Sequence, residues 1–534
     1  MAEISYLHPH MQTSIVDNSV VLPEQAAVGT VMFMPYFSSR GVDGEIRLYN
    51  SYSEFLLENG TPNFKKHGQA IYNVLQFLSS GGSVYGMRVV PKDAKKASVV
   101  LGKGVNGETG EIEDSEEVGN QLLKFSCKGR GVYGNKLRIQ IDFNKNLTEG
   151  YGFAVYEIMV IDSGRVLEGP YYVALNPEAR DVAGQSMYIK NIIEQYSTNI
   201  EVEIDEDQYD ILIEALAGEE EPLMVDVLGA KVPLELQLDG GNDGSPVFGK
   251  GEGIAERRTE LLAEAFAHPD IVNKRRFPLD ILMDANFDTA VKAAIAALAN
   301  KRGDCFAFFD LTTEYGADTE AALSGMQLLS TSINERKFAV YGQTFIVYDG
   351  FTNSDINVTM TYLLAGKIPT HDRTYGVQYP FAGPSRGLLT GFKSMSFNPE
   401  PEEKEALYRA RVNYAEQDYR NTKLMSQLTA QSANTALSNI NNMRTLLRMI
   451  VAVEEISEEY FFEFASPGTL ASFNAAINNY LSSWVANGAC TVCNGTVYQN
   501  PYDVAQKIVR VRVEVVFTGI IERIVIEFNV GANA

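Results

Sequence analysis

The chain contains little cysteine and histidine, with four cysteines and five histidines among its 534 residues. So few cysteines exclude a fold built on a framework of disulfides. Cys490 and Cys493 have the C-x-x-C spacing of redox motifs and half zinc sites, but a zinc site needs two more ligands and no histidine lies near them in the sequence. We therefore expect two reduced cysteines in a loop, with no metal site and no cofactor.

Long apolar runs and an excess of basic residues are also absent. The longest apolar runs, such as Ala26–Met34 and Ile450–Val453, fall far short of the ~20 residues that cross a bilayer. Residues Met1–Val20 lack the basic and apolar regions of a secretory signal. The net charge of -23 disfavours binding to phosphate backbones. We expect a protein that is assembled in a cytoplasm, without nucleic acid and without direct membrane insertion.

The length of the chain predicts several domains, because single hydrophobic cores stop growing at roughly 250–300 residues. Two stretches have the alternating strands and helices of α/β layers. In the first, strands are expected at Val28–Met34 and Val84–Val90, with helices at Glu54–Leu57 and Gln69–Leu78. In the second, strands are expected at Phe277–Met283, Cys305–Leu311 and Phe338–Tyr348, with a helix at Asp288–Asn300.

The regions between and after these stretches have other patterns. A Gly- and Glu-rich loop at residues 102–120 opens an insertion of short strands, expected at Lys136–Phe143, Ala154–Ile161 and Asn199–Ile204 and closed by the turn Asp239–Gly244. Residues Glu402–Phe464 are largely helical in propensity around a polar interruption, and Leu446, Ile450 and Val453 fall on one helical face. Leu470–Trp484 predicts a further helix.

The chain ends in two segments with strict two-residue alternation. Valines alternate with charged residues over Val509–Val515, and after a turn at Thr518-Gly519 the residues Ile524, Ile526, Phe528 and Val530 alternate with their neighbours. This period predicts two strands, whose backbone groups need a partner at home or in a neighbouring molecule. The pattern alone favours pairing within the chain.

Several segments match catalytic or metal-binding patterns only in part. Gly383-Pro-Ser385-Arg-Gly387 matches G-x-S-x-G, but prolines break the strand before it and no histidine follows His371, so we expect a loop. An Asp43, His67 and Ser394 set is an arbitrary selection in so long a chain. Asp239–Lys250 fails as a calcium loop, since Gly241 and Lys250 occupy ligand positions. We expect no catalytic residues and no enzyme; a serine hydrolase using Ser385 is a distant alternative.

Six segments, in order along most of the chain, resemble the contractile tail sheath family of bacteriophages. They are Ala27–Pro35 with Ser53–Phe55, the helix and glycine turn Ala70–Gly82 with the Y-x-x-R-V strand Val84–Val90, Gly131–Ile139, the L-x-G-G-x-D-G turn Leu238–Gly244, Lys301–Ala307, and the helical segment Asn439–Glu463. Residues 366–400 and the tail after Thr518 are less similar.

This resemblance implies a multidomain α/β and α+β protein with a subtilisin-like sheath domain. The implied parts are an N-terminal linking arm (1–25), a sheath domain in two pieces (26–101 and 245–365), an inserted β-rich outer domain (102–244), an α+β inner domain (366–517) and a C-terminal linking arm (518–534). Linking arms add strands to a neighbour's sheet, which reverses the preference for pairing within the chain. The implied linking residues are Ile4, Tyr6, Ile15, Val16, Ile524, Ile526, Phe528 and Val530.

The implied function is a virion sheath that polymerises as a helix, in stacked six-fold rings, around the tail tube. A baseplate triggers a metastable extended form to contract, without nucleotide hydrolysis, while rigid bodies slide and rotate. The partners implied are other copies of the chain, the tube protein, and baseplate and tail terminator proteins. Arg444 and Arg448 are candidates for tube contact, against the alternative of a solvated helix face. The sheath of a phage-tail-like bacteriocin is the near alternative.

Overall fold

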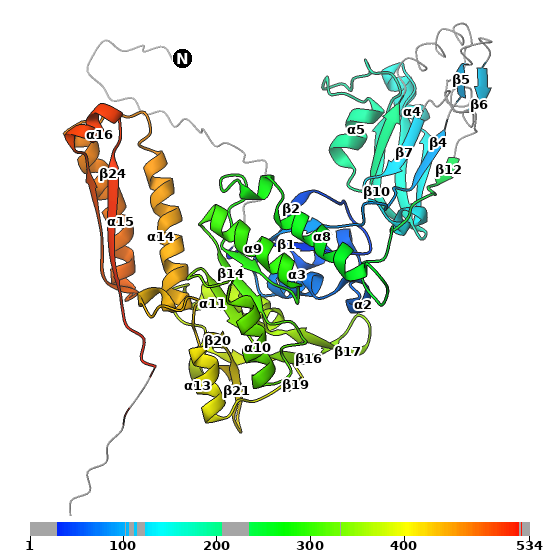
Figure 1. Cartoon of the computed structure of the whole chain (residues 1–534). Helices are drawn as coiled ribbons and strands as arrows, with labels where there is room; N and C mark the ends of the chain where they lie inside the picture. The colour runs from blue at the N-terminus through cyan, green and yellow to red at the C-terminus, as the bar shows by residue number, and fades with distance from the viewer. Residues whose placement is uncertain are drawn as a thin grey trace, which may run out of the picture.

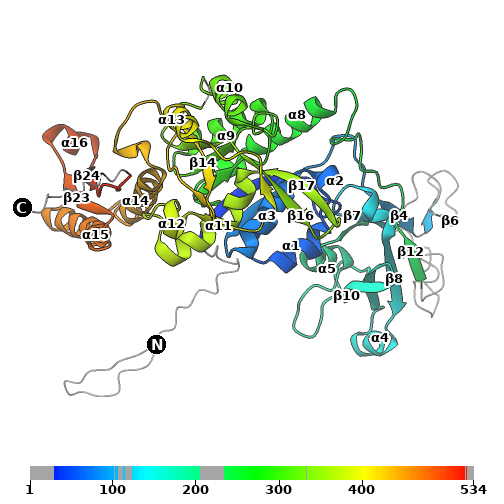
Figure 2. The same cartoon turned by 90° about the horizontal axis from the view of Figure 1, so that it is seen from below.

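The computed structural model describes residues 29–101, 103–105, 112–114, 123–204, 234–331, 333–522 and 525. Three parts can be followed in Figure 1. The body comprises residues 29–96 and 239–448, the insertion comprises the described residues between 97 and 238, and the C-terminal module comprises residues 449–517. Figures 1 and 2 both place the insertion and the C-terminal module on opposite sides of the body.

The body is built on a seven-stranded sheet in the order β2-β3-β1-β13-β14-β15-β20. All of its pairings are parallel except that of β2 with β3. Parallel strands are covered on both faces, and this explains the near-continuous apolar runs from which they were predicted. The seven strands are Val31–Tyr36 (β1), Ile46–Tyr49 (β2), Ser83–Arg88 (β3), Ile281–Met283 (β13), Phe306–Asp310 (β14), Phe338–Tyr341 (β15) and Val412–Asn413 (β20).

Helices cover both faces of this sheet. The α3 crossover connects β1 to β3 on one side of β1, whereas α9 connects β13 to β14 in the other direction, so right-handed crossovers place them on opposite faces. Helix α3 packs with α11, and α8 packs with α9. The helices are Tyr52–Asn59 (α1), Phe64–His67 (α2), Ala70–Ser79 (α3), Ile254–Phe266 (α8), Thr289–Arg302 (α9), Thr319–Leu329 (α10), Met360–Tyr375 (α11), Gly383–Arg386 (α12), Pro401–Arg409 (α13) and Ile440–Glu458 (α14).

Two small sheets complete the body, and one of them corrects a predicted strand. The expected strand Phe338–Tyr348 is two strands, β15 in the large sheet and β16 in an antiparallel sheet. The chain turns between them at Gly342 and Gln343, where the Gln343 amide nitrogen donates to the backbone oxygens of Phe397 (2.9 Å) and Ala415 (2.8 Å). The strands of the small sheets are Thr344–Asp349 (β16), Ser354–Thr359 (β17), Leu388–Leu389 (β18), Ser394–Met395 (β19), Ala415–Gln417 (β21) and Thr422–Leu424 (β22).

A buried polar cluster lies at the carboxyl ends of β13 and β14. Lys292 is 1% exposed and its Nζ lies 2.5 Å from a carboxylate oxygen of Asp284. The hydroxyls of Thr359 and Thr361 donate to Asp310, whose pKa is raised to about 8 by burial and by the nearby Asp284. These partners satisfy the charged groups within the core, so the cluster fixes α9, β14 and β17 relative to one another.

The insertion has its own core of strands and one amphipathic helix. Side chains such as Phe125, Ile139, Ile158 and Ile193 are fully buried in it. The predicted strands correspond to β8, β9 and β11 and are confirmed. Its elements are Ser98–Leu101 (β4), Lys103–Val105 (β5), Ile112–Asp114 (β6), Leu123–Cys127 (β7), Leu137–Phe143 (β8), Lys145–Tyr151 (α4), Tyr156–Asp162 (β9), Arg165–Val173 (β10), Ile189–Tyr196 (α5), Ile200–Ile204 (β11) and Leu234–Gln237 (β12).

The C-terminal module consists of the end of α14, two further helices and a two-stranded antiparallel sheet. The elements after α14 are Pro467–Ala486 (α15), Cys490–Tyr498 (β23), Pro501–Gln506 (α16) and Arg510–Phe517 (β24). The helix predicted at Leu470–Trp484 and the strand predicted at Val509–Val515 are confirmed as α15 and β24. Val511, Val513 and Val515 of β24 pack against the cluster that α15 contributes to, while Arg510 and Glu514 are exposed.

Two expectations for the last region need correction. Residues 410–439, between α13 and α14, form short strands, loops and one 3-10 turn at Ala436–Ser438, so the expected polar interruption is longer than the pattern indicated. On α14 the most buried apolar residues are Ile440, Met443, Leu447 and Met449, whereas Ile450 is 36% exposed. The periodicity located the helix correctly but placed its apolar face one or two residues away from the buried one.

The buried apolar side chains form separate clusters in the body and in the C-terminal module. Apolar side chains from Ile368 to Leu447 belong to the core of the body, and a separate cluster begins at Met449. The domain boundaries expected from the resemblance stay a prediction, because core clusters alone do not define folding units.

Candidate assembly surfaces

Ser385 does not form a nucleophile elbow. It lies in the short helix α12, not in the expected loop, and turns and loop residues rather than a strand precede it. The Asp43 carboxylate accepts a hydrogen bond from the Arg130 side chain, and Ser394 lies in β19. His67 Nδ1 accepts from the backbone N–H of Asn63 at 3.0 Å, and burial lowers the pKa of His67 to about 4. None of the catalytic patterns considered from the sequence is therefore assembled among the described residues.

The two C-x-x-C cysteines lie in strand β23, which corrects the expected loop. Both are free and buried, and burial raises the pKa of Cys490 to about 11. Protonated, buried thiols are poor nucleophiles and poor metal ligands. Within the described ranges no cluster of His, Cys, Asp and Glu could hold a metal ion. None of the helices in those ranges combines the length and apolar character of a membrane-spanning segment.

Three of the sequence motifs meet where the insertion joins the body. Arg88, from the Y-x-x-R-V strand, is 3% exposed, and its Nη1 donates to the backbone oxygens of Gly41 (2.9 Å) and Arg130 (2.8 Å). Asn135 donates to the oxygen of Gly241 (3.0 Å) and accepts from its N–H (2.7 Å). Glycine is required at position 241, because a Cβ there would lie 2.6 Å from the oxygen of Gly131.

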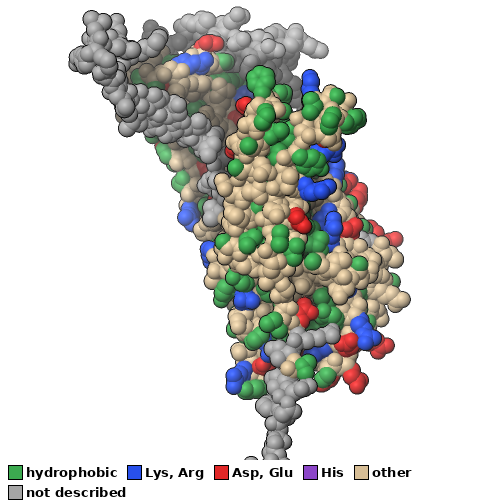
Figure 3. Space-filling view, turned by 90° about the vertical axis from the view of Figure 1, so that its left-hand side faces the viewer, with side chains coloured by type: hydrophobic (Ala, Val, Ile, Leu, Met, Phe, Trp, Pro, Cys, Tyr) green, Lys and Arg blue, Asp and Glu red, His purple; other side chains and the backbone are tan. Residues whose placement is uncertain are grey.

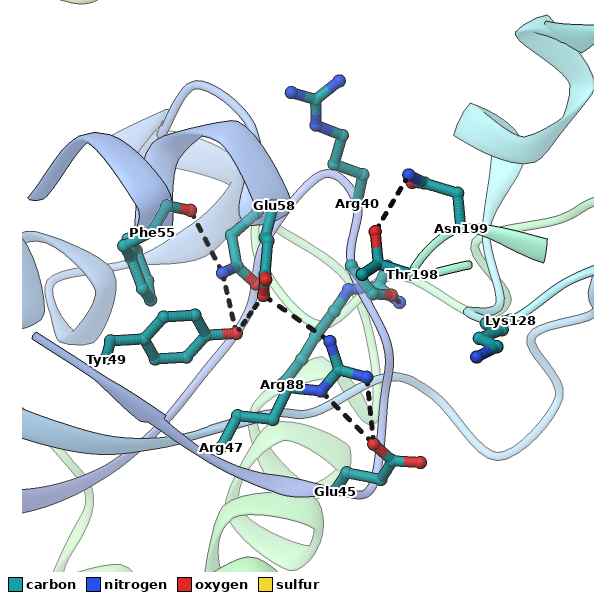
Figure 4. Close-up of polar contacts among 12 residues, drawn as sticks. Arg40, Glu45, Arg47, Tyr49, Phe55, Glu58, Arg88, Lys128, Thr198 and Asn199 are labelled. Atoms are coloured by element: carbon teal, nitrogen blue, oxygen red, sulfur yellow. Dashed lines mark hydrogen bonds and ion pairs between the residues drawn. The ribbon is translucent and has the colours of Figure 1, made fainter. Parts of the chain in front are cut away.

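Further polar contacts surround this junction. Figure 4 shows a chain of contacts in which Arg47 lies between Glu45 and Glu58, and Glu58 accepts from Tyr49. Burial, followed by the Glu58 charge, raises the pKa of Tyr49 to about 12, so its hydroxyl stays a donor. Arg40 reaches across to the insertion, with its Nη1 3.5 Å from Asp162. Body and insertion are therefore held together by hydrogen bonds of Arg88 and Asn135 and by the ion pair of Arg40 with Asp162.

The two arginines proposed for tube contact lie in different environments on α14. Arg444 is 5% exposed and binds the Asp372 carboxylate with both terminal nitrogens, one of them at 3.0 Å. Burial alone would raise the pKa of Asp372, but the Arg444 guanidinium holds it well below its usual range. Arg448 is 40% exposed and pairs with Asp280 at 2.8 Å. Arg444 is thus committed to the subunit interior, and only Arg448 offers a charge near the surface.

The two outer edges of the β23–β24 sheet differ. The N–H groups of Gly495 and Val497, in β23, donate to the side chains of Asn478 and Asn474 at 2.9 Å each, and Gly495 accepts from Asn478. These two residues therefore point away from β24, and their cross-strand partners Val513 and Val511 must point outward from the other edge. No described strand pairs with that outer edge of β24. Helix α15 thus closes one edge, while the other has no strand partner within the described part of the chain.

The tip of the C-terminal module carries exposed aromatic side chains. Phe461, Phe462 and Phe464 are 63%, 107% and 88% exposed, in the connection between α14 and α15. They border a cavity of about 890 Å³ that Val504 and Val509 also line. Figure 3, which faces the module, shows hydrophobic side chains scattered in patches among uncharged surface, with more charged side chains along one side than the other. Exposed apolar surface of this kind marks a contact with another molecule.

The expected linking residues cannot be placed relative to these surfaces. Residues Ile4, Tyr6, Ile15, Val16, Ile524, Ile526, Phe528 and Val530 lie outside the described residues.

The sequence matches no protein-family model and no curated protein. Solved structures do match. The sheath tail protein of Listeria innocua is similar over 92% of this chain and 96% of its own, with a TM-score of 0.56 and 11% identity. The helical sheath of the anti-feeding prophage in its contracted state is similar over 97% of this chain and 99% of its own, with a TM-score of 0.50 and 12% identity. Likeness at such low identity reports on fold, and it extends over nearly the whole chain. The chain has the mixed α/β, multi-sheet fold of the contractile sheath proteins.

Proposed function

We propose that this chain is the structural, non-enzymatic subunit of a contractile sheath, which polymerises as a helix around a tube and contracts to drive it through an envelope. The open edge of β24 is the observation that carries this proposal. A strand with unpaired backbone groups beside exposed aromatic side chains is unusual in a protein that acts alone, because such an edge readily pairs with another chain.

The linking step is strand addition between copies. In this proposal an alternating segment of a neighbouring subunit, at its N-terminus (Ile4 to Val16) or C-terminus (Ile524 to Val530), pairs with β24. The backbone groups of Val511 and Val513 supply the hydrogen bonds, and alternate side chains enter the apolar side of the sheet. Such links are extended segments, so neighbours stay joined while the bodies slide and rotate during contraction.

The remaining parts have separate proposed roles. The body, which we propose is subtilisin-like in topology, and the insertion move together, since the polar junction at Arg88 and Asn135 fixes them. The exposed face of α14 at Arg448 contacts the tube. Stacked six-fold rings, a baseplate and a tail terminator complete the particle, in which the subunit is a virion component assembled in the host cytoplasm.

A bacteriophage tail is the first candidate for the particle, because a single long chain with a large insertion favours a phage virion. A phage-tail-like bacteriocin or another injection device is the second, and the likeness to the anti-feeding prophage sheath favours it. Both use the same subunit mechanics.

The proposal is tested by a pair of substitutions at the open edge. Val513→Pro removes an outward N–H that the β23–β24 ladder does not use, and proline is tolerated at such edge positions. Val513→Thr keeps the N–H and is the matched control. We expect wild-type and V513T protein to sediment as polymers and to form hollow striated tubes in electron micrographs. V513P is expected to melt like V513T yet stay dispersed.

Tubes formed equally well by V513P would contradict strand addition at β24. Dispersed wild-type protein under every condition, including added tube protein, would contradict the sheath function itself.

A further inference from the structure

A cavity of about 500 Å³ lies beside α11, under the segment that contains α12 and β18. Its lining residues include the basic side chains Lys367 and Arg386 and the imidazole of His371, and hydroxyl groups of Thr370, Tyr375 and Ser385 also line it. None of its lining residues is Asp or Glu, although the chain as a whole has a net charge of -23. The cavity is therefore a local concentration of positive charge on an acidic protein.

The charges in this cavity lack anionic partners. Lys367 and Arg386 form no ion pair with any described residue; the Lys367 amino group donates to the backbone oxygen of Leu388 (2.8 Å) and Arg386 Nε to that of Pro380 (3.1 Å). Burial without a neighbouring carboxylate lowers the pKa of Lys367 to about 8. A half-buried ammonium that bears this desolvation gains free energy when an anion approaches it.

His371 gives a second, independent indication of a ligand. Its side chain is 4% exposed, lines the cavity, and makes no hydrogen bond from either ring nitrogen within the described part of the chain. Nδ1 lies 3.5 Å from Asp372 Oδ1, and Arg444 donates to the same oxygen at 3.0 Å. Buried polar atoms are normally satisfied, so the unpartnered Nε2 of an imidazole at a cavity wall indicates a missing hydrogen-bond partner.

We propose that this cavity is a binding site for an oxyanion, with Lys367 and Arg386 supplying charge and His371 a hydrogen bond. Two sources present this chemistry: a carboxylate side chain of a second copy in the polymer, or a free inorganic anion such as phosphate. The first source rests on the proposed sheath function, whereas the second does not. Ser385, singled out by its G-x-S-x-G context, then serves as a hydroxyl donor at the rim rather than as a nucleophile.

The first arm of the test uses inorganic phosphate with the full chain. Phosphate is titrated against chloride at constant ionic strength, and the unfolding midpoint is followed for wild type, the double variant Lys367→Met with Arg386→Leu, and the control Lys301→Met with Arg409→Leu. The control removes the same charge from exposed positions on α9 and α13. We expect phosphate to stabilise wild type and control, and to bind the double variant about tenfold or more weakly, as two lost charge-assisted hydrogen bonds imply.

The second arm identifies the source of the anion. If a second copy supplies the carboxylate, the critical concentration for polymerisation rises about tenfold or more in the double variant only, and phosphate competes with assembly. If the source is a free anion, the double variant polymerises like the control. Identical phosphate responses and identical polymerisation of double variant and control would overturn the proposal. Because the first arm needs no polymer, its result stands even if wild type does not assemble.

Discussion

The body and the C-terminal module differ in how completely they bury their own strands. All six residues of β1 and all five of β14 are buried, because helices cover both faces of the large sheet. In β24 every second residue is exposed and no residue is fully buried. The central strands of the body are thus buried by its own helices, whereas the described part of the module leaves β24 half-exposed. In the proposed sheath, a neighbouring subunit covers this strand.

The contrast between body and module is tested most strongly by replacing one phenylalanine in each of them with alanine. Phe308→Ala removes a fully buried ring that packs on Phe306 with centroids 4.9 Å apart, and should lower the free energy of unfolding by about 3–5 kcal/mol. Phe462→Ala removes a ring that is 107% exposed, and should change it by less than about 0.5 kcal/mol. Denaturant unfolding of the two variants measures both values.

Polymerisation should depend on Phe462, although the free energy of unfolding does not. F462A is expected to raise the concentration needed for polymerisation, because in the proposed sheath the exposed ring of Phe462 is covered by a neighbouring molecule. A destabilised F462A subunit that still assembles normally would mean that this tip belongs to the subunit's own fold.

The two arginines of α14 allow the same contrast between buried and exposed groups to be tested where the body meets the module. Arg444→Met leaves the buried Asp372 carboxylate without its partner and should cost about 3–5 kcal/mol. Arg448→Met breaks a partly exposed pair and should cost about 0–1 kcal/mol. Thermal or denaturant unfolding measures both, and equal costs would show that Arg444 is not the buried anchor of α14.

The Asp372–Arg444 pair also predicts a pH dependence. The folded pKa of Asp372 lies below its ordinary value of 3.8, so the folded state binds its proton less readily than the unfolded state. The pair therefore stabilises the protein above about pH 4, and this stability is lost as pH falls below that value. R444M should lose this acid-dependent contribution, which a comparison of unfolding at pH 6 and pH 3 would detect.

Much of the body could be predicted from the sequence because burial on both faces of a parallel sheet leaves continuous apolar runs. The strands around Phe33, Val84 and Phe308 were located in this way. The division of Phe338–Tyr348 into two strands was missed, since it depends on contacts of Gln343 with residues more than fifty positions away. Local patterns do not record such contacts.

The assembly surfaces were predictable only in part. Alternation identified β24, but its partner β23 was taken for a loop because Cys490 and Cys493 suggested a short motif rather than a strand. Nothing in the sequence signals that Asn474 and Asn478 would close one edge of the sheet and leave the other open. Arg444 was interpreted as a surface charge because its partner Asp372 lies on another helix.

Hydrogen exchange at individual backbone amides tests the central claim most directly. In the dispersed subunit, the amides of Gly495 and Val497 should already be protected by Asn478 and Asn474, while those of Val511 and Val513 exchange rapidly. On assembly the account predicts that exchange at Val511 and Val513 slows about tenfold or more, as a strand from a neighbour pairs with β24. Unchanged rapid exchange at these two amides within formed polymers would contradict it.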